Sequence, residues 1–378
     1  MIPVCFDITS LQYGRGVSRY TSNIIEALAK KKEVDLWAYG STGRTHSQLK
    51  QLVDKLPIPS NQVTIDRVPV KFLPYIWQLG LLPPTRKLTK PCLFHSWDWH
   101  QPSLEKNVGL ISTIHDLAIL KFPETADPDV LKHHNLSWEK LKKNNAHIIA
   151  VSQTTKQDVI DLLDYPSDRV HVVYEALPIE TKEVMDNLSE EKYQKIKDGL
   201  KLDKPFILFV GTREPRKNLK RLAEAMKPLA KNYDLVIAGA KSGKNTPDWL
   251  KHPFIKVLGR VSDEHLAVLY EEASLFAYPS LYEGFGLPIL EAFSHGTPVV
   301  TSNNSGMKEV AGNAAELVNP ESVTSITKGI EKILNENFDN QQLRLKKMII
   351  RGQMFSWNLA ANQMLKIYEQ AYQELLDK

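Results

Sequence analysis

The segment Ser280–Val300 reads S-L-Y-E-G-F-G-L-P-I-L-E-A-F-S-H-G-T-P-V-V and determines the predicted fold. The apolar run that precedes it, residues 274–278, has the length and composition of a buried strand. Gly284 and Gly286 then break the chain, and Pro288 stands where the first turn of a helix tolerates proline. The sequence therefore predicts a strand, a glycine turn and a helix, a unit of α/β sheets in which backbone N–H groups point toward a ligand.

Two glutamates flank this predicted turn. Glu283 lies on the loop and Glu291 about one turn into the helix, so both can face the crevice at the carboxyl end of the sheet. A carboxylate accepts hydrogen bonds from two hydroxyl groups at once, which suits the vicinal hydroxyls of a ribose or a pyranose. A helix cap and a solvated surface residue would explain two isolated glutamates. The glycines, the aromatic residue and the proline between them are hard to explain by solubility.

This segment resembles the donor-site signature of the retaining glycosyltransferases of family 4, in the mannosyltransferase-like group with the GT-B fold. The resemblance implies that Glu283 contacts the transferred sugar and that Glu291 holds the nucleotide ribose. It also implies donor contacts along the turn, from Gly284, Phe285, Gly286 and Leu287.

Length and composition describe an ordinary globular protein. The chain has 378 residues, which favours two domains of about 150–200 residues each. No apolar run reaches the roughly 18 residues of a membrane-spanning helix, and the N-terminus reads as a first strand rather than a signal peptide. Cys5 and Cys92 each stand in an apolar stretch, which indicates buried thiols in a reducing cytoplasm.

The formal net charge of +4 is mild. It permits contact with an anionic donor, or a peripheral contact at the inner face of an anionic membrane, but it does not indicate nucleic-acid binding, which usually needs clustered basic residues. We therefore expect a cytoplasmic protein with no nucleic-acid partner.

A second glycine loop follows the first predicted strand, residues 2–8. Gly14 and Gly16 precede a predicted helix, 18–30, but a third glycine and a ribose-binding acid after the next strand are missing. A tight turn explains this weak dinucleotide fingerprint equally well. The run 16–20, G-V-S-R-Y, resembles the family's glycine loop, which implies that both glycines lie against the donor diphosphate or the acceptor.

A histidine stands at the end of another predicted strand, residues 110–114, where ligand contacts fall in an open sheet. A lone histidine is more often structural. The run 115–124, H-D-L-A-I-L-K-F-P-E, nevertheless resembles the family strongly. The resemblance implies that His115 contacts the transferred sugar and that Asp116 orients its ring.

Asp127-Pro-Asp129 matches the D-x-D pattern with which a different glycosyltransferase fold binds metal. Here it precedes a predicted helix, 130–143, and acidic residues with a first-turn proline are typical of a helix N-terminus. We therefore interpret it as a cap, and we expect no metal ion and no cofactor. The basic residues of the helix indicate either a solvated face or a patch that meets a lipid-linked acceptor at a membrane.

The segment 211–218, G-T-R-E-P-R-K-N, follows an apolar strand, where arginine and lysine can neutralise a diphosphate. It resembles the family's E-P-R-K-N/G loop, which implies that Lys217 binds the donor diphosphate. Many members have arginine directly after the glycine, whereas this chain has Thr212. Either Arg213 or Arg216 is then expected to supply the second positive charge.

The predicted fold is α/β of the GT-B type, with two Rossmann-like domains that face each other across a deep cleft. The predicted boundaries are 1–178 for an acceptor domain, 179–204 for a connection, 205–356 for a donor domain and 357–378 for a helix that packs back on the first domain. The ends of two further strands are expected near the nucleotide base, at Gly239, Arg260 and Val261.

The predicted activity is retaining, metal-independent transfer of a hexose, with GDP-mannose as the favoured donor and a saccharide or lipid-linked saccharide as the acceptor. Three alternatives remain open: a UDP- or ADP-sugar-dependent transferase of the same fold, a nucleotide-sugar epimerase, and an inert nucleotide-sugar-binding subunit. A dehydrogenase is disfavoured by the missing third glycine and ribose acid.

Overall fold

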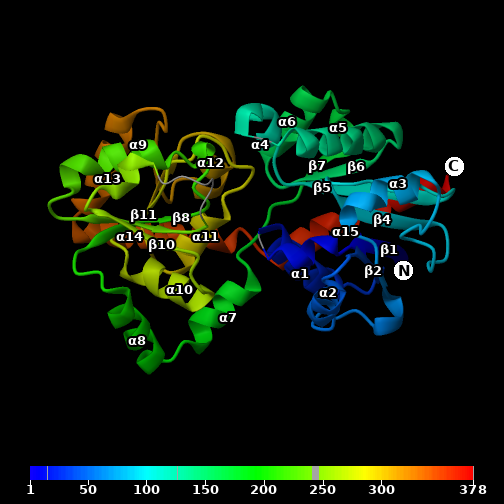
Figure 1. Ribbon diagram of the computed structural model, residues 1–378, viewed down its shortest axis with the longest axis horizontal. Coiled ribbons are helices and arrows are strands. Elements are labelled where there is room, and N and C mark those ends of the chain that lie inside the picture. Colours follow the sequence, from blue (N-terminus) through cyan, green and yellow to red (C-terminus); the bar gives the residue numbers. More distant parts are fainter. Residues whose placement is uncertain (15, 126, 241–246, 378) are drawn as a thin grey trace. The chain divides into compact units, whose positions relative to one another are not determined.

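The computed structural model describes residues 1–14, 16–125, 127–240 and 247–377, and it divides into two compact units (Figure 1). The first unit comprises Met1–Glu175 together with Ser356–Lys378, and the second comprises Ala176–Phe355. The chain thus leaves the first unit after Glu175 and returns to it after Phe355.

The described part of the first unit contains a seven-stranded parallel sheet in the order β3-β2-β1-β4-β5-β6-β7. The order reverses between β1 and β4, which is the kind of switch point at which open α/β sheets bind ligands. The strands are β1 (Ile2–Asp7), β2 (Val34–Ser41), β3 (Val63–Asp66), β4 (Cys92–Trp97), β5 (Val108–Ile114), β6 (His147–Ala150) and β7 (Val170–Val172).

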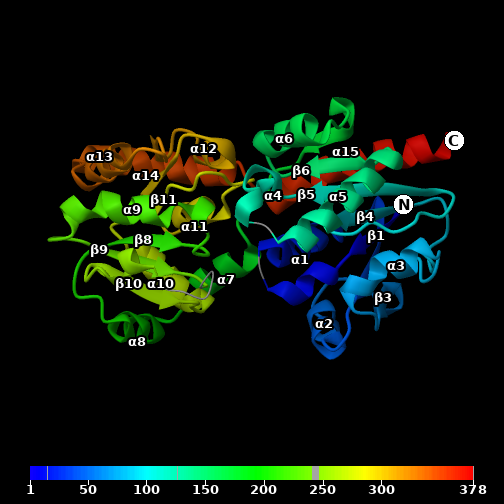
Figure 2. The same cartoon turned by 45° about the horizontal axis from the view of Figure 1, so that its top comes forward.

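Helices cover both faces of this sheet (Figure 2). Neighbouring residues of a strand point to opposite faces, so a strand that is buried along its length packs against helices on both sides. On β4, Phe94 belongs to a buried apolar cluster with residues of α3 and α5, whereas His95 bonds to Tyr368 of α15. The helices are α1 (Gly16–Leu28), α2 (His46–Val53), α3 (Leu73–Gln78), α4 (Ala118–Lys121), α5 (Pro128–Lys143), α6 (Gln153–Leu163) and α15 (Trp357–Leu376), with short 3-10 turns η1 (Thr9–Tyr13), η2 (Ser60–Gln62), η3 (Val70–Phe72), η4 (Pro123–Thr125) and η5 (Ser167–Arg169).

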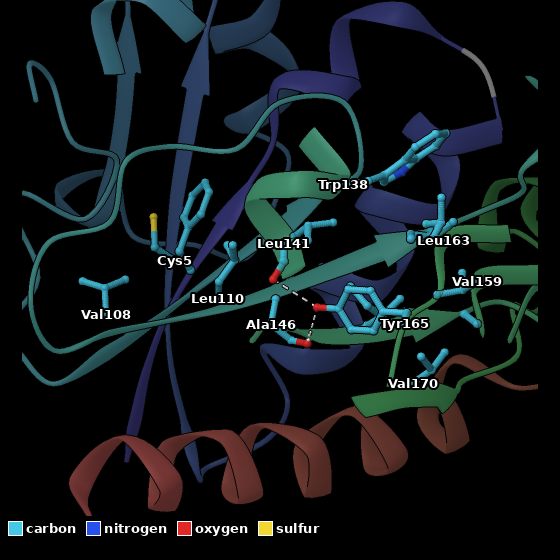
Figure 3. Packing of buried hydrophobic residues seen from close by; sticks show 14 of the residues in the cluster. Cys5, Val108, Leu110, Trp138, Leu141, Ala146, Val159, Leu163, Tyr165 and Val170 are labelled. Atoms are coloured by element: carbon cyan, nitrogen blue, oxygen red, sulfur yellow. Dashed lines mark hydrogen bonds between the residues drawn. The ribbon is translucent and has the colours of Figure 1, made fainter. Parts of the chain in front are cut away.

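A buried tyrosine joins α5 to the strands within this apolar cluster (Figure 3). The Tyr165 hydroxyl lies 3.1 Å from the carbonyl oxygen of Leu141 and 2.8 Å from that of Ala146. These carbonyls stand where α5 ends and the chain turns into β6, and the hydroxyl satisfies polar groups that burial would otherwise leave costly.

The described part of the second unit contains a six-stranded parallel sheet in the order β10-β9-β8-β11-β12-β13, which reverses between β8 and β11. Its strands are β8 (Phe206–Val210), β9 (Asp234–Ala238), β10 (Ile255–Gly259), β11 (Leu275–Tyr278), β12 (Val299–Ser302) and β13 (Glu316–Val318). Its helices are α7 (Ile179–Asn187), α8 (Glu190–Leu200), α9 (Leu219–Met226), α10 (Asp263–Glu272), α11 (Leu287–Ser294), α12 (Ser305–Ala311), α13 (Val323–Leu334) and α14 (Phe338–Gln353), with 3-10 turns η6 (Pro215–Lys217), η7 (Lys227–Leu229) and η8 (Asp248–Lys251).

Residues 179–204, expected as a connection, form α7 and α8 and belong to the second unit. Glu272 of α10 accepts the Tyr193 hydroxyl at 2.6 Å and pairs with Lys197 at 2.7 Å. The polar composition of this segment comes from helices that expose most of their surface, with Ile196 as the buried residue of α8. Among the described helices, none has the length and apolarity needed to cross a membrane.

Candidate functional site

A compact charged cluster lies at the switch point of the second sheet. The ammonium group of Lys217, after β8, lies 2.6 Å from Glu283 Oε1 and 2.8 Å from the hydroxyl of Tyr278, the last residue of β11. The other carboxylate oxygen of Glu283 accepts a hydrogen bond from Arg216 at 2.8 Å. Three predicted site residues from two loops are therefore in direct contact, and we call them, with Tyr278, the Lys217–Glu283 cluster.

Burial and charge act against each other in this cluster. Burial raises the pKa of Glu283, but the neighbouring Lys217 and Arg216 more than offset this and hold it at about 2. The carboxylate is therefore ionised at neutral pH. Burial also lowers the pKa of Lys217, and Glu283 opposes that shift. Each of these two buried groups thus depends on its partner to stay ionised.

Asn218 helps to hold the loop after β8 in place. Asn218 adopts a left-handed conformation, with φ of 61°, which asparagine tolerates better than most residues. Its amide donates to the carbonyl oxygens of Pro279 at 2.9 Å and Pro320 at 2.7 Å. Because Asn218 follows Lys217 directly, these bonds fix the lysine against the end of β11.

The glycine turn of the predicted signature packs tightly against the start of α12. A Cβ atom built on Gly306 would lie 2.3 Å from the carbonyl oxygen of Gly284, so only glycine fits there. The N–H of Gly306 donates to the Glu283 carbonyl at 3.0 Å. Gly286, with φ of 110°, precedes Leu287 at the start of α11. Phe285 is buried edge-on against Phe355, at 5.6 Å between ring centroids.

Glu291 points inward from α11 and is buried. The hydroxyl of Tyr270 on α10 donates to Glu291 Oε2 at 2.9 Å. The tyrosine ring stacks on His295 at 5.2 Å between centroids. This packing restricts the orientation of the carboxylate, as a group that recognises two hydroxyls requires.

Two glycines bring the ends of β8 and β9 together. A Cβ on Gly239 would lie 1.9 Å from the carbonyl oxygen of Gly211, so the backbones approach too closely for any side chain. Arg213, two residues after Gly211, has a buried Nε without a hydrogen-bond partner among the described residues. Arg260 and Val261 instead follow β10, the edge strand, and the structure does not place them in the Lys217–Glu283 cluster.

In the first unit, the predicted sugar-contacting histidine follows β5. His115 Nδ1 lies 2.8 Å from Glu175 Oε1, and its ring meets Tyr20 edge-on at 4.7 Å between centroids. His115 Nε2 is buried without a hydrogen-bond partner among the described residues. Burial lowers the pKa of His115, but nearby carboxylates, Glu175 foremost, together more than offset this, and the pKa lies above the ordinary value of 6.5.

The expected role of Asp116 needs correction. An Asp116 side-chain oxygen accepts the N–H of Ala118 at 2.9 Å, as aspartate often does in turns. Glu175 is therefore the carboxylate that orients the ring of His115, and Asp116 shapes the turn that leads into α4.

The first glycine loop lies at the end of η1. Gly14 has φ of 58°, which explains the glycine, whereas Gly16 begins α1 with no such requirement. A Cβ on either residue would meet no atom within 4 Å, so internal packing does not require these glycines. Arg15, between them, lies outside the described residues.

The D-x-D segment is confirmed as a helix cap. The Asp127 side chain accepts the N–H of Asp129 at 2.9 Å, and Pro128 begins α5. Among the described residues, no group of three or more His, Cys, Asp and Glu side chains is placed to hold a metal ion.

Three residues that hold the predicted ones were not expected from the sequence: Tyr278, Tyr270 and Glu175. Tyr278 ends β11 and Glu175 stands just after β7, so a search of every strand's carboxyl end would have found both. Tyr270 lies inside α10, and no local pattern marks it.

Two Rossmann-like parallel sheets, with glycine turns and buried charged residues at their strand ends, define the GT-B class of fold. Solved structures of glycosyltransferases share this fold. Sucrose-phosphate synthase from Thermosynechococcus elongatus has a TM-score of 0.71 at 19% identity, over 99% of this chain and 100% of that chain. WaaG, a glycosyltransferase involved in lipopolysaccharide biosynthesis, has a TM-score of 0.68 at 16% identity, over 97% and 99%.

The chain belongs to glycosyltransferase family 4 and fits its mannosyltransferase-like group. The model described as Glycosyltransferase Family 4 matches residues 14–181, and the one described as Glycosyl transferases group 1 matches residues 190–351. The predicted family and GT-B fold are thus confirmed.

Curated relatives include bacterial mannosyltransferases. O-antigen chain mannosyltransferase B of Escherichia coli is 28% identical over 94% of this chain and 96% of its own length. The serotype-specific mannosyltransferase WbdA of Escherichia coli is 31% identical over 65% of this chain but only 32% of its own length.

Proposed function

We propose that this glycosyltransferase is a retaining, metal-independent mannosyltransferase that uses GDP-mannose in the synthesis of a glycan. The observation that carries the proposal is the Lys217–Glu283 cluster, in which two cations hold one ionised carboxylate at the sheet switch point. The relatives named as O-antigen mannosyltransferases support mannose as the sugar.

Departure of the nucleoside diphosphate places negative charge on the β-phosphate. Lys217 and Arg216 stabilise that charge, because both are already fixed by Glu283 and need little rearrangement. In our proposal the diphosphate takes over part of their pairing, which leaves Glu283 to accept hydrogen bonds from the sugar hydroxyls. Glu291, held by Tyr270, accepts those of the ribose.

The transfer itself breaks the bond between the anomeric carbon and the β-phosphate oxygen. The acceptor oxygen attacks the same face of the sugar, and its proton passes to the departing phosphate oxygen. His115, which Glu175 orients through Nδ1, donates through Nε2 to a hydroxyl of the transferred sugar. No residue of the chain is covalently modified in this sequence of events. The acceptor is a saccharide or a lipid-linked saccharide.

The test is a thermal-shift panel of GDP, UDP, ADP and dTDP with their common sugars. Binding to the folded state alone raises the melting temperature by mass action. We expect GDP and GDP-mannose to raise it for the native protein and to lose this effect in Glu291→Ala. The exposed Glu191→Ala variant on α8 should respond as the native protein does.

A shift with UDP or ADP instead of GDP would identify a different donor nucleotide and would still support the proposed donor site. No shift with any nucleotide, in a folded protein, would refute the donor site. NMR of the product decides the stereochemistry, because retention gives an α-linked mannoside from the α-linked donor and inversion a β-linked one.

A further inference from the structure

The segment around helix α3 exposes an unusual number of large apolar side chains. Tyr75 is 64% exposed and Leu79 73%, far more than large apolar residues of a packed domain usually are. Further large apolar side chains in the same stretch are exposed, namely Phe72, Leu81 and Leu82. We call Phe72–Leu82 the α3 segment.

Helix α3 has two apolar faces. Leu73 and Trp77, four positions apart, are buried in the apolar cluster of the first unit. Phe72, Tyr75 and Leu79 stand three and seven positions apart, so they share a second face of the helical turn. The core accounts for the first face only. The second face is apolar without contributing to the fold.

The stretch of sequence that contains this face carries charge of one sign. Between Asp66 and Asp98 the sequence contains five lysines and arginines and no aspartate or glutamate. Asp66 is itself neutralised by Arg86, at 2.6 Å. Arg67, Lys71 and Lys87 are exposed, and the Lys71 ammonium lies 5.0 Å from the ring centre of Phe72. Positive residues therefore flank the exposed apolar side chains along the sequence, and Lys71 lies directly beside Phe72.

Helix α5, the basic helix considered from the sequence, is a weaker candidate for such a surface. Trp138 and Leu141 are buried in the core, and Lys140 donates to the Gln101 carbonyl at 2.9 Å. His134 lies 3.4 Å from Asp98. All of α5 lies within the described residues, and the large apolar side chain that it exposes is Leu136.

We propose that the α3 segment docks the protein on an anionic lipid membrane. Phe72, Tyr75 and Leu79 enter the boundary between head groups and acyl chains, where tyrosine and large apolar side chains are favoured. Lys71 and Lys87 meet the lipid phosphates. A second copy of the chain is a poorer occupant, because two like-charged patches would repel each other.

The proposal does not depend on the donor site, so its test needs no sugar nucleotide. Purified full-length protein is mixed with vesicles of phosphatidylcholine alone, or with one third phosphatidylglycerol, and the bound fraction is measured by flotation. We expect binding to the anionic vesicles only, with at least a tenfold fall in partitioning for Tyr75→Ser/Leu79→Ser. Lys71→Ser/Lys87→Ser should also bind at least tenfold more weakly, and added salt should weaken native binding.

A matched control comes from α14 of the second unit, where Phe338 is 71% exposed and Ile350 63%. Phe338→Ser/Ile350→Ser removes comparable apolar groups and should bind vesicles as the native protein does. An unchanged melting temperature for each variant shows that it is folded.

Failure of the native protein to bind anionic vesicles would overturn the proposal. Equal losses in the α3 and α14 variants would do the same, because the effect would then be general hydrophobicity. Concentration-dependent dimers that Tyr75→Ser/Leu79→Ser abolishes, without vesicle binding, would assign the surface to a second copy instead.

Discussion

Glu283 carries the most constrained charge of the candidate site. Both of its carboxylate oxygens are engaged by cations, and its pKa is held at about 2. Removing one partner of a buried ion pair is costly, because the remaining charge stays buried without compensation. The cluster is therefore part of the stability of the second unit as well as a candidate for donor binding.

Glu283→Gln should destabilise the protein by about 3 kcal/mol at pH 7, since Lys217 loses its buried counter-charge. The folded pKa of Glu283 lies below the ordinary value of 4.5. Its contribution is thus fully present above pH 4.5 and is lost as the pH falls toward 2. Urea unfolding of both proteins from pH 7 to pH 3 measures the difference, which should shrink with decreasing pH.

The exposed pair Lys251–Asp248 provides the control, with side chains 68% and 95% exposed. Asp248→Asn should change the unfolding free energy by less than about 0.5 kcal/mol, because exposed ion pairs contribute little. Equal effects of the two substitutions would show that the buried pair Glu283–Lys217 contributes no more to the unfolding free energy than the exposed pair does.

His115 should titrate abnormally because of Glu175. In Glu175→Gln, burial is no longer offset by the carboxylate, so the pKa of His115 should fall below 6.5. In the native protein the raised pKa stabilises the fold below pH 6.5, and this contribution is lost as the pH rises through the folded value. NMR titration of the imidazole gives the pKa directly.

Asp116→Asn is the matched comparison, because Asp116 raises the pKa of His115 less than Glu175 does. It should lower that pKa much less than Glu175→Gln. A larger effect from Asp116 would restore its expected role as the residue that orients the ring of His115.

At the scale of elements, local patterns predicted most of what the structure contains. The glycine turn, α11 and the basic loop after β8 are each predicted by residues of their own segment or its immediate neighbours. The partners of the predicted residues have no such signal. Tyr278 meets Lys217 only because β11 pairs with β8, across more than sixty residues of sequence. Strand order is a tertiary property, and a single sequence does not specify it locally.

The contact between the glycine turn and α12 should be intolerant of any side chain. Gly306→Ala places a methyl group 2.3 Å from the Gly284 carbonyl oxygen, so the turn that carries Glu283 must shift. We expect a loss of about 2 kcal/mol in stability, typical of overpacking, and weaker nucleotide binding. Unfolding curves and the thermal-shift panel measure these two effects.

Gly352 in α14 is the control for this substitution. A Cβ there meets no atom within 4 Å, and alanine is the better helix former. Gly352→Ala should leave nucleotide binding unchanged and stability equal or slightly higher. If Gly306→Ala behaves in the same way, the turn is less rigid than its contacts indicate.

For the whole molecule, the sequence predicted two Rossmann-like halves but not every boundary. Residues 179–204 have the polar, lysine-rich composition of a linker, yet they form helices that pack on α10. Most residues of such helices are exposed, so the overall composition is polar. The few residues that make the contact, here Ile196 and Tyr193, do not stand out in that composition. Helix boundaries and the membership of a unit depend on these few contacts.

Because α15 belongs to the first unit but follows the second in the chain, the two units cannot be completed in the order in which they begin. On the ribosome, Tyr368 emerges after all of Ala176–Phe355, and until then His95 on β4 lacks its 2.6 Å partner. The second unit is continuous and can fold while the first still exposes the apolar face that α15 will cover. The half that begins translation first is therefore the last to become native, and nascent chains should engage chaperones through that uncovered face.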